Sequence, residues 1–357
     1  MVLVLRAKKS EEWQLNIIVT GGCGFIGSNA VARFCAKGHN VLVIDNLSRQ
    51  GTAANLEYLQ QKFNFEYLRA DLVNLDDYEP VVNRFKPDWI LHCAGQVAVT
   101  TSVANPRLDF EGNVLATFNL LEICRNLADP PFFLFASTNK VYGDLEGVQT
   151  EEGDTRYRYK GSFSGVPESW PLNFHSPYGC SKGAADQYVL EYSRTYGIAS
   201  TVFRQSCIYG PRQFGLEDQG WIAWFMIASL LGEPITIFGE GKQVRDALHV
   251  DDLLDAYELA FHNREKVSGR AYNIGGGPDN TLSVLELVSK IETLTGLPIS
   301  PGYGPRRPSD QNIFVSDLTA AGRDLLWSPT ISVEVGLESL FHWIKENSDT
   351  IREQLDK

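Results

Sequence analysis

The sequence has little of what a membrane protein or a nucleic-acid-binding protein needs. Its longest apolar run, WIAWFMIASLL at 221–231, has 11 residues and is too short to cross a bilayer. Positive charge is in deficit, because 32 Lys and Arg stand against 44 Asp and Glu, a net charge of −12. These deficits predict that neither a membrane nor a nucleic acid is the main partner. A few arginines in a cleft can still bind an anionic small ligand.

Patterned cysteines and a secretory leader are also missing. The six cysteines show neither metal-ligand spacing nor a disulfide framework, which predicts no metal site and free, mostly buried thiols in a reducing cytosol. Basic residues follow a very short apolar stretch in MVLVLRAKKSEEWQ, which is the wrong order for a secretory signal. We therefore expect an extension over 1–14 and a cytoplasmic location. The cysteines are Cys23, Cys35, Cys93, Cys124, Cys180 and Cys207.

What the chain does have is a regular alternation of short apolar runs and amphipathic segments, with no internal repeat. Such alternation is typical of βαβ units and a parallel sheet. We predict an α/β fold, a Rossmann-type doubly wound parallel sheet with a smaller C-terminal substrate lobe. The cofactor domain is expected at 15–206, with part of 244–275 returning to it, and the lobe at 207–243 and 276–345. Periodicity stops at 150–177, which predicts a long loop. Strands are predicted at 15–20, 40–45, 65–70, 88–93, 132–137 and 200–204, and helices at 110–126, 178–196, 219–231, 251–262 and 283–295.

A glycine-rich turn directly follows the first predicted strand. In VTGGCGFIGSNA, Gly21, Gly24 and Gly27 open a helix, where bare backbone and a helix N-terminus can receive a pyrophosphate. Asp45 ends the second predicted strand, where a carboxylate can bind both ribose hydroxyls and repel a 2′-phosphate. The combination predicts a dinucleotide site and favours NAD over NADP, although Arg49 nearby leaves NADP open.

A Tyr and a Lys four residues apart share one face of a helix. The pattern occurs twice, as Tyr58/Lys62 and as Tyr178/Lys182. The second pair follows a predicted strand that ends at Thr138, so we interpret it as catalytic and the first pair as a surface feature. The cation is expected to lower the pKa of the phenol from about 10 towards neutrality. Thr138 would bind the substrate oxygen that Tyr178 deprotonates, which indicates hydride-transfer chemistry.

These motifs resemble the extended, sugar-nucleotide branch of the short-chain dehydrogenase/reductases. The glycine spacing fits that type, ADL (70–72) is similar to its adenine-contacting segment, and HCAGQ (92–96) to the strand end beside the nicotinamide ribose. In the 4,6-dehydratases of this branch an acid pair follows the Thr, whereas here Asn139 and Lys140 stand there. Asn139 cannot ionise and Lys140 suits neither acid nor base role, so epimerisation is expected in place of elimination.

Longer segments resemble the CDP-paratose 2-epimerase (CDP-tyvelose 2-epimerase) family over about residues 15 to 345. These are STNKVYGDLE (137–146), FHSPYGCSKGAADQY (174–188), YGPRQFGLEDQGW (209–221), GKQVRDALHVDD (241–252) and RPSDQNIFVSD (307–317). The resemblance implies retained NAD, transient oxidation of the sugar at C2, re-reduction on the other face, and a place in lipopolysaccharide O-antigen biosynthesis. A UDP- or CDP-hexose 4-epimerase with the same trio stays open, as does a non-catalytic NAD-binding relative. A homo-oligomer is expected.

The resemblance also implies residue roles. Thr138, Tyr178 and Lys182 are the expected catalytic set, and Arg245 and Arg307 are expected to clamp the substrate diphosphate. Cys207 departs from the Asn that related epimerases often carry, which puts that substrate contact in doubt. The expected cofactor residues are Gly21, Gly24, Phe25, Ile26, Gly27, Asp45, Asn46, Ser48, Arg49, Asp71, Leu72, Ala94, Gly95, Gln96, Tyr178 and Lys182. The expected substrate residues are Val97, Thr138, Asn139, Arg204, Cys207, Arg212, Gln213, Arg245 and Arg307.

Overall fold

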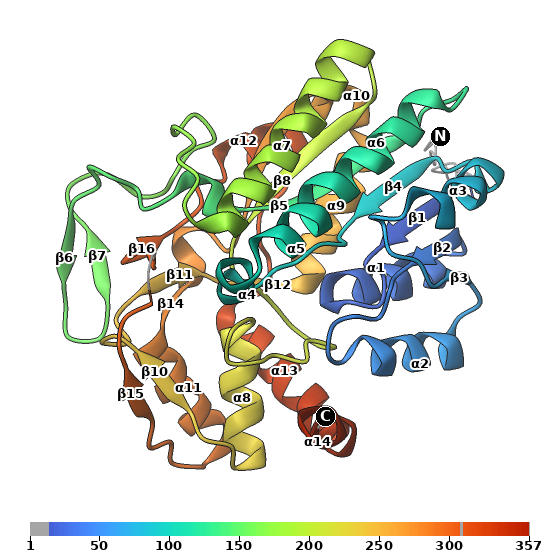
Figure 1. Ribbon diagram of the computed structural model, residues 1–357. Helices are drawn as coiled ribbons and strands as arrows, with labels where there is room; N and C mark the ends of the chain where they lie inside the picture. The colour runs from blue at the N-terminus through green and yellow to red at the C-terminus, as the bar shows by residue number, and fades with distance from the viewer. Residues whose placement is uncertain (1–13, 308–309, 357) are drawn as a thin grey trace, which may run out of the picture.

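A seven-stranded, all-parallel sheet forms the centre of the computed structural model (Figure 1). The structure describes residues 14–307 and 310–356, so the extension predicted at 1–14 falls outside it apart from its last residue. The strand order extends the 3-2-1-4-5 arrangement of a doubly wound fold, and the predicted fold class is confirmed. In spatial order the strands are β13 (Arg270–Ile274), β8 (Ser200–Gln205), β5 (Phe132–Thr138), β4 (Trp89–His92), β1 (Asn16–Thr20), β2 (Asn40–Ile44) and β3 (Glu66–Leu68).

Helices cover both faces of this sheet, because its strands are apolar on both sides. One hydrophobic cluster joins the sheet to α1, α2 and α9, and a second joins it to α3, α6 and α7. The helices of the first face are α1 (Phe25–Ala36), α2 (Thr52–Lys62) and α9 (Val250–His262). Those of the second face are α3 (Glu79–Phe85), α6 (Ala116–Asn126) and α7 (Ser176–Tyr196).

Strand register brings the carboxyl ends of the central strands to one edge of the sheet. Thr20 at the end of β1 lies opposite both Ile44 and His92. β5 extends further than its neighbour, since Phe135 is the residue opposite His92 and the strand continues to Thr138. The segments that follow β1, β2, β4 and β5 therefore meet at this edge, with Thr138 projecting beyond it.

The smaller lobe packs its own core below the sheet (Figure 1). The apolar run 221–231 forms α8 at the centre of this core, as predicted, and six of its residues are buried. The lobe helices are α8 (Trp221–Leu231), α11 (Val284–Thr295) and α13 (Val333–Glu346), followed by α14 (Ser348–Leu355). Its strands are β9 (Ile208–Tyr209), β10 (Thr236–Phe238), β11 (Val244–Asp246), β12 (Leu248–His249), β14 (Thr281–Ser283), β15 (Gly302–Gly304) and β16 (Ile313–Phe314).

Two segments differ from the sequence-based prediction. The loop expected at 150–177 contains a short antiparallel hairpin, β6 (Thr150–Glu152) and β7 (Tyr157–Tyr159). The sequence did not predict these strands because the segment has no regular hydrophobic periodicity. The helix expected from 110 begins as α5 (Pro106–Phe110) and passes through a π-helical turn at Glu111–Leu115 before α6. The remaining elements are α4 (Val99–Ala104), α10 (Arg264–Val267), α12 (Thr319–Leu325) and 3₁₀ turns at Leu75–Asp77, Asn139–Tyr142 and Pro278–Asn280.

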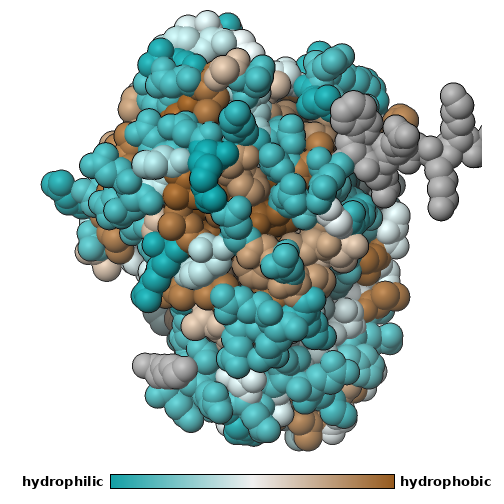
Figure 2. All heavy atoms as spheres, turned by 90° about the vertical axis from the view of Figure 1, so that its right-hand side faces the viewer, coloured by the Kyte–Doolittle hydropathy of each residue, from teal (hydrophilic) through white to brown (hydrophobic). Residues whose placement is uncertain are grey.

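The surface offers no membrane-spanning element in the described part of the chain, where no helix is long and apolar enough to cross a bilayer. Figure 2 shows one face, on which hydrophilic side chains predominate and hydrophobic ones are visible between them near its middle. All six cysteines are free. Cys180 is exposed, so the prediction of buried thiols is wrong at that position, where the side chain lies on the outer side of α7.

Candidate active site

The turn between β1 and α1 has the shape that a dinucleotide pyrophosphate requires. Gly21 has a φ of 65°, and a Cβ there would lie 2.7 Å from the Ala94 nitrogen. A Cβ on Gly27 would lie 2.1 Å from the Gly21 carbonyl oxygen. Gly24 is the N-cap of α1 and has no side chain, so no side chain caps the first N–H groups of the helix. These residues fit the phosphate end of NAD.

Acidic and amide side chains follow the next two strands. Asp45, 8% exposed, accepts hydrogen bonds from the Cys23 N–H (2.9 Å) and the Leu47 N–H (2.8 Å). Burial raises the pKa of this carboxyl, and the two backbone bonds oppose that rise. Asn46 donates to Asp71 at 2.9 Å, which joins the segments after β2 and β3. The group fits the adenosine end of the cofactor. Phe25, Ile26, Ser48, Leu72, Gly95 and Gln96 follow the ends of β1 to β4 in the same way.

Arg49 does not turn towards Asp45. Its guanidinium donates to the Gln219 side chain at 3.2 Å and lies 3.9 Å from Asp218, both in the loop before α8. Its charge also lowers the pKa of the Tyr178 phenol. Arg49 therefore reaches from the cofactor domain across to the smaller lobe, next to the predicted catalytic tyrosine.

The structure brings Thr138 and Tyr178 together. Thr138 ends the projecting part of β5, and Tyr178 lies in the first turn of α7. A hydrogen bond from Thr138 lowers the pKa of Tyr178, but burial outweighs it and raises that pKa to about 12. The hydroxyl of Thr138 also accepts a bond from the Lys140 N–H at 3.3 Å. The tyrosine and threonine thus face one point at the sheet edge.

The electrostatic role predicted for Lys182 stays a prediction, because its amine is engaged elsewhere in this structure. Its amine donates to the Ala136 carbonyl at 2.6 Å and lies 4.1 Å from the centre of the Phe135 ring. Burial lowers the pKa of Lys182 to about 8. The amine is therefore held under β5, and the cation that lowers the pKa of Tyr178 is that of Arg49.

The other Tyr–Lys pair is not a surface feature throughout. Lys62 lies 5.0 Å from the centre of the Tyr58 ring, but the half-buried Tyr58 also contacts Arg212, 5.2 Å from its ring centre. The phenol accepts a hydrogen bond from the same guanidinium at 3.4 Å. Tyr58 therefore helps to hold a loop of the smaller lobe against α2.

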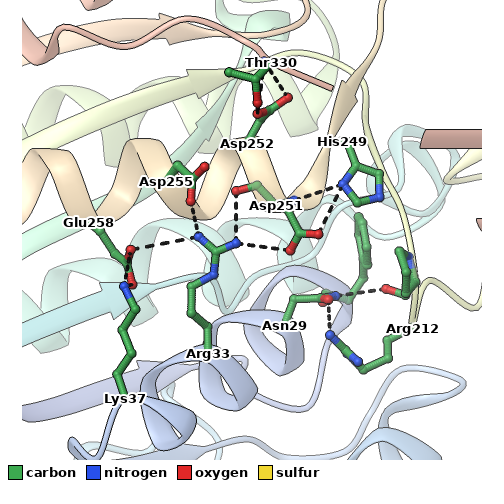
Figure 3. Close-up of polar contacts among 12 residues, drawn as sticks. Asn29, Arg33, Lys37, Arg212, His249, Asp251, Asp252, Asp255, Glu258 and Thr330 are labelled. Carbon is green, nitrogen blue, oxygen red and sulfur yellow. Dashed lines mark hydrogen bonds and ion pairs between the residues drawn. The ribbon is translucent and has the colours of Figure 1, made fainter. Parts of the chain in front are cut away.

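Arg212, expected to bind substrate, makes its contacts within the protein in this structure. Its φ of 67° turns the side chain back towards α1 and α2, where it donates to the Asn29 side chain (Figure 3). Asn29 in turn donates to the Pro211 carbonyl at 2.9 Å. Arg212 lies behind the glycine-rich turn and fixes the loop after β9. Gln213 beside it is 3% exposed, and its amide donates to the Ile208 carbonyl at 3.4 Å.

Arg204, also expected to bind substrate, has its guanidinium engaged beneath α7. It bonds both carboxylate oxygens of Asp186, at 2.9 and 3.0 Å, and the Tyr142 hydroxyl at 3.1 Å. Asp186 is 0% exposed and also accepts from Ser137 at 2.9 Å. The arginine is therefore the internal partner of a buried acid in this structure, and its substrate role stays a prediction.

Arg245 and Arg307 lie in the smaller lobe near one cavity. Arg245 pairs with Asp310 at 2.5 Å, and Arg307 lies 4.1 Å from the centre of the Phe238 ring. Arg307 and Asp310 line a cavity of about 410 Å³, whose wall also includes Asp144. Asp144 belongs to the STNKVYGD stretch and follows Thr138 by six residues in the sequence.

The positions after the catalytic threonine contain no acid pair. Asn139 is buried, and its side-chain oxygen accepts from Thr138 at 3.4 Å. Burial and the charge of Arg245 lower the pKa of Lys140 to about 8, while Asp310 and Asp144 oppose them. Cys207 is half-buried and its sulfur accepts from the Trp221 indole at 3.0 Å. Val97 is half-buried after β4.

Sequence reasoning missed a buried polar group beside Tyr178 and Lys182. Asp109, 1% exposed, accepts hydrogen bonds from Gln96 (2.9 Å) and Asn113 (3.2 Å). Asn113 also donates to Ser181 at 3.0 Å, on the turn of α7 between the tyrosine and the lysine. Sequence alone gives no signal for it, because Arg107 and Glu111 flank Asp109 in the same segment and pair with each other in the structure.

The fold and this site define a class. A doubly wound parallel sheet with a bare glycine turn, an acid after β2, and a Thr–Tyr–Lys set at the sheet edge is a dinucleotide-dependent enzyme of the Rossmann type. The model of the NAD dependent epimerase/dehydratase family matches residues 17–275. The chain belongs to this family, and the prediction of NAD as cofactor is confirmed.

Three similar proteins illustrate the likeness. CDP-paratose 2-epimerase of Salmonella typhi is 44% identical over 92% of this chain and 99% of its own length. The structure of UDP-glucose 4-epimerase with UDP-glucose from Thermotoga maritima has a TM-score of 0.80 and 31% identity, covering 93% of this chain and 99% of that one. The structure of UDP-glucuronic acid 4-epimerase from Bacillus cereus with UDP-glucuronic acid and NAD has a TM-score of 0.79 and 27% identity, covering 92% and 99%.

Proposed function

We propose that this protein is an NAD-dependent epimerase that inverts C2 of a CDP-dideoxyhexose, of the CDP-paratose to CDP-tyvelose type. The observation that carries the proposal is the 44% identity, over almost the full length of both chains, to a CDP-paratose 2-epimerase. The Asn139–Lys140 pair after Thr138 supports it, because two non-acidic side chains cannot carry out an elimination.

The chain's own side chains supply the proton chemistry. Tyr178 takes the proton from the C2 hydroxyl, and Thr138 hydrogen-bonds the same oxygen. The two side chains lie together at the sheet edge. Lys182 leaves the Ala136 carbonyl to hold the nicotinamide ribose. NAD, when bound, supplies the acceptor that takes the C2 hydride and returns it.

The reaction balances without an external reductant. The C2 alcohol loses a hydride and a proton and becomes a 2-keto sugar, which turns in the site and regains both on its other face. A redox route is required, because the C2–H of a sugar without a neighbouring ketone is not acidic. Arg49, whose charge acts on Tyr178, contacts Gln219 of the smaller lobe.

The substrate diphosphate is assigned to Arg245 and Arg307. Arg245 is largely buried and its partner Asp310 is more exposed, so a doubly charged diphosphate can replace the carboxylate. The cavity beside Arg307 supplies room for part of the nucleotide. The Cys207 sulfur is already engaged by Trp221, so the diphosphate would depend on the arginines and not on a donor at this position.

A 4-epimerase acting on a UDP- or CDP-hexose is the second candidate. The likeness to UDP-glucose 4-epimerase, in both sequence and structure, favours it. Both reactions use the same trio, so the difference depends on how the pocket orients the sugar. The position of the inverted carbon in the product distinguishes the two directly.

The test is incubation of the purified protein with CDP-paratose in deuterated water, without added NAD, followed by proton NMR. A manno-configured CDP sugar that keeps its original hydrogen at C2 is expected. Deuterium at C2 would contradict the closed redox cycle. Absence of turnover, with CDP- and UDP-hexoses inverted at C4, would establish the second candidate. Tyr178→Phe is the control that must abolish turnover while keeping bound NAD.

We also propose that the protein is a cytoplasmic homo-oligomer that serves O-antigen biosynthesis. Large hydrophobic side chains on adjacent helices support the oligomer, since Phe118 on α6 and Tyr188 on α7 are exposed and lie 5.9 Å apart. Leu108 and Phe110 on α5 are also exposed. Light scattering of the wild type and of Phe118→Asp checks this, with a smaller mass expected for the variant.

A further inference from the structure

A buried histidine in the cofactor domain has no role in the reaction described above. His92 is the last residue of β4 and is 0% exposed. The rings of Phe133 and Phe135 on β5 lie 5.7 and 5.4 Å from its ring centre. A polar ring in such apolar surroundings needs a hydrogen-bond partner for each of its two nitrogens, and the structure supplies both.

The two partners are threonines from different elements. The Thr20 hydroxyl oxygen, at the end of β1, lies 2.7 Å from Nδ1 of His92. The Thr117 hydroxyl oxygen, on α6, lies 2.9 Å from Nε2. Both threonines are 0% exposed. The imidazole therefore joins the strand that precedes the glycine turn to helix α6.

The direction of these hydrogen bonds follows from the other contacts of the threonines. Thr117 donates its hydroxyl hydrogen to the Asn113 carbonyl at 2.6 Å, so towards His92 it can only accept. Nε2 must therefore carry the ring hydrogen, and Nδ1 must accept from the hydroxyl of Thr20. The oxygen of Thr20 in turn accepts from the Ala94 N–H at 3.4 Å.

The chain of hydrogen bonds from Ala94 to Asn113 thus runs in one direction and requires a neutral ring. A protonated His92 would point a second N–H at Thr20, whose own hydrogen would then lose its acceptor. Burial opposes the charged form as well, because it lowers the pKa of His92 to about 3.

Both ends of this chain reach the candidate active site. Ala94 begins the expected cofactor segment after β4, and a Cβ on Gly95 would lie 2.5 Å from the side-chain oxygen of Asn113. The Asn113 amide donates to the Ser181 hydroxyl on α7 at 3.0 Å. Ser181 donates to the Tyr178 carbonyl at 3.1 Å. Helix α6 is therefore tied both to the cofactor segment and to the turn of α7 that carries Tyr178.

We propose that His92, as the neutral tautomer with its hydrogen on Nε2, is a positioning residue that fixes α6 between β1 and α7 and thereby sets Tyr178 against the cofactor segment. It acts through Thr20 and Thr117. A misplacement of about 1 Å at a reacting group can cost about 100-fold in rate. The inference rests on the proposed function for the reaction whose rate is measured, but not for the hydrogen bonds.

The first experiment reads the tautomer in the NAD-bound protein, labelled with ¹⁵N-histidine, without sugar. The ring resonances of His92 are identified by their absence from His92→Asn. We expect a protonated Nε2 and an unprotonated Nδ1 that do not titrate between about pH 5 and 8, where a free histidine does. A hydrogen on Nδ1, or a ring that titrates in this range, would overturn the inference.

The second experiment compares Thr117→Val with Thr201→Val, because valine keeps the shape of threonine and removes only its hydroxyl. Thr201 is also 0% exposed and donates to the Arg270 carbonyl at 2.9 Å, but it lies on β8 four residues before Gln205, the residue opposite Thr138. We expect Thr117→Val to lower kcat by about 10- to 100-fold, with KM within about twofold of wild type. The ring hydrogen of His92 should move to Nδ1 in this variant. Thr201→Val should change neither kcat nor the tautomer, and Thr117→Ser, which keeps the hydroxyl, should recover kcat.

Equal kcat values for Thr117→Val and Thr201→Val would contradict the positioning role, even if both variants lose thermal stability. If Thr117→Val does not fold, Thr20→Val breaks the chain at its other end, and the same criterion applies to it. The tautomer is read without sugar, so failure of the wild type to convert CDP-paratose would count against the proposed function alone. The kinetic comparison then uses the nucleotide sugar that the wild type does invert.

Discussion

Replacing Arg204 by methionine tests whether this residue contacts the substrate or supports the fold through Asp186. The side chain is 5% exposed, and its removal leaves the fully buried Asp186 without its cation. Breaking one side of a buried ion pair costs about 3–5 kcal/mol. The entropy of unfolding near 60 °C is about 2.1 cal/mol/K per residue, or ~0.75 kcal/mol/K for 357 residues. Arg204→Met is therefore expected to lower the Tm by about 4–7 °C.

Calorimetry of the NAD-bound protein measures this shift, and steady-state kinetics with the CDP sugar measures KM. We expect KM to stay within about twofold of wild type in the folded variant. Arg125→Met is the matched control, because Arg125 is 38% exposed and pairs with Glu122 on one turn of α6. The double variant Arg204→Met/Asp186→Leu should recover part of the lost stability. An unchanged Tm with a tenfold higher KM, order of magnitude, would refute the reasoning and restore Arg204 as a substrate residue.

Three further predictions concern pH, the cofactor turn and the diphosphate. The pKa of the buried His92 is about 3 against 6.5, so the unfolded chain binds a proton first as pH falls below 6.5. The free energy of unfolding should then drop by ~1.4 kcal/mol per pH unit, and urea titrations should show a shallower pH slope for His92→Asn. Gly27→Ala places a methyl group 2.1 Å from the Gly21 oxygen. The purified variant should contain little NAD by absorbance, whereas Gly322→Ala, where a Cβ meets nothing closer than 3.7 Å, should retain it. Arg245→Ala should weaken CDP binding by about 10- to 100-fold in calorimetric titrations, with Arg107→Ala as the unaffected control.

Six of the seven sheet strands could be predicted from the sequence because they are short apolar runs between turn residues. The seventh, RAYNI at β13, mixes polar and apolar residues. It lies at the edge of the sheet beside β8, where Arg270 is exposed and the buried Asn273 donates to the Val166 carbonyl at 2.8 Å. A central strand of this composition would not satisfy the packing of both faces.

The candidate site was predictable where local chemistry decides it. The glycine turn and Asp45 need only their own strand ends, and the structure places them together. The contacts of Arg204 and Arg212 could not be predicted because their directions depend on tertiary structure, a buried acid on α7 for one and a left-handed φ for the other. Asp109 was missed because one polar residue in a helix carries no signal until its partners are known.

The position of β13 has a consequence for synthesis of the chain on the ribosome. β8 ends at residue 205, but its outer neighbour spans 270–274, after the chain has passed through the smaller lobe. Arg33 and Lys37 on α1 likewise form ion pairs with Asp251 and Glu258 on α9, which is synthesised much later (Figure 3). At roughly 5–20 residues per second, the edge of β8 stays unpaired for about 3–14 s. During that interval the nascent chain exposes an open strand edge, so a chaperone that covers apolar edges should raise the yield of native protein more than one that acts after release.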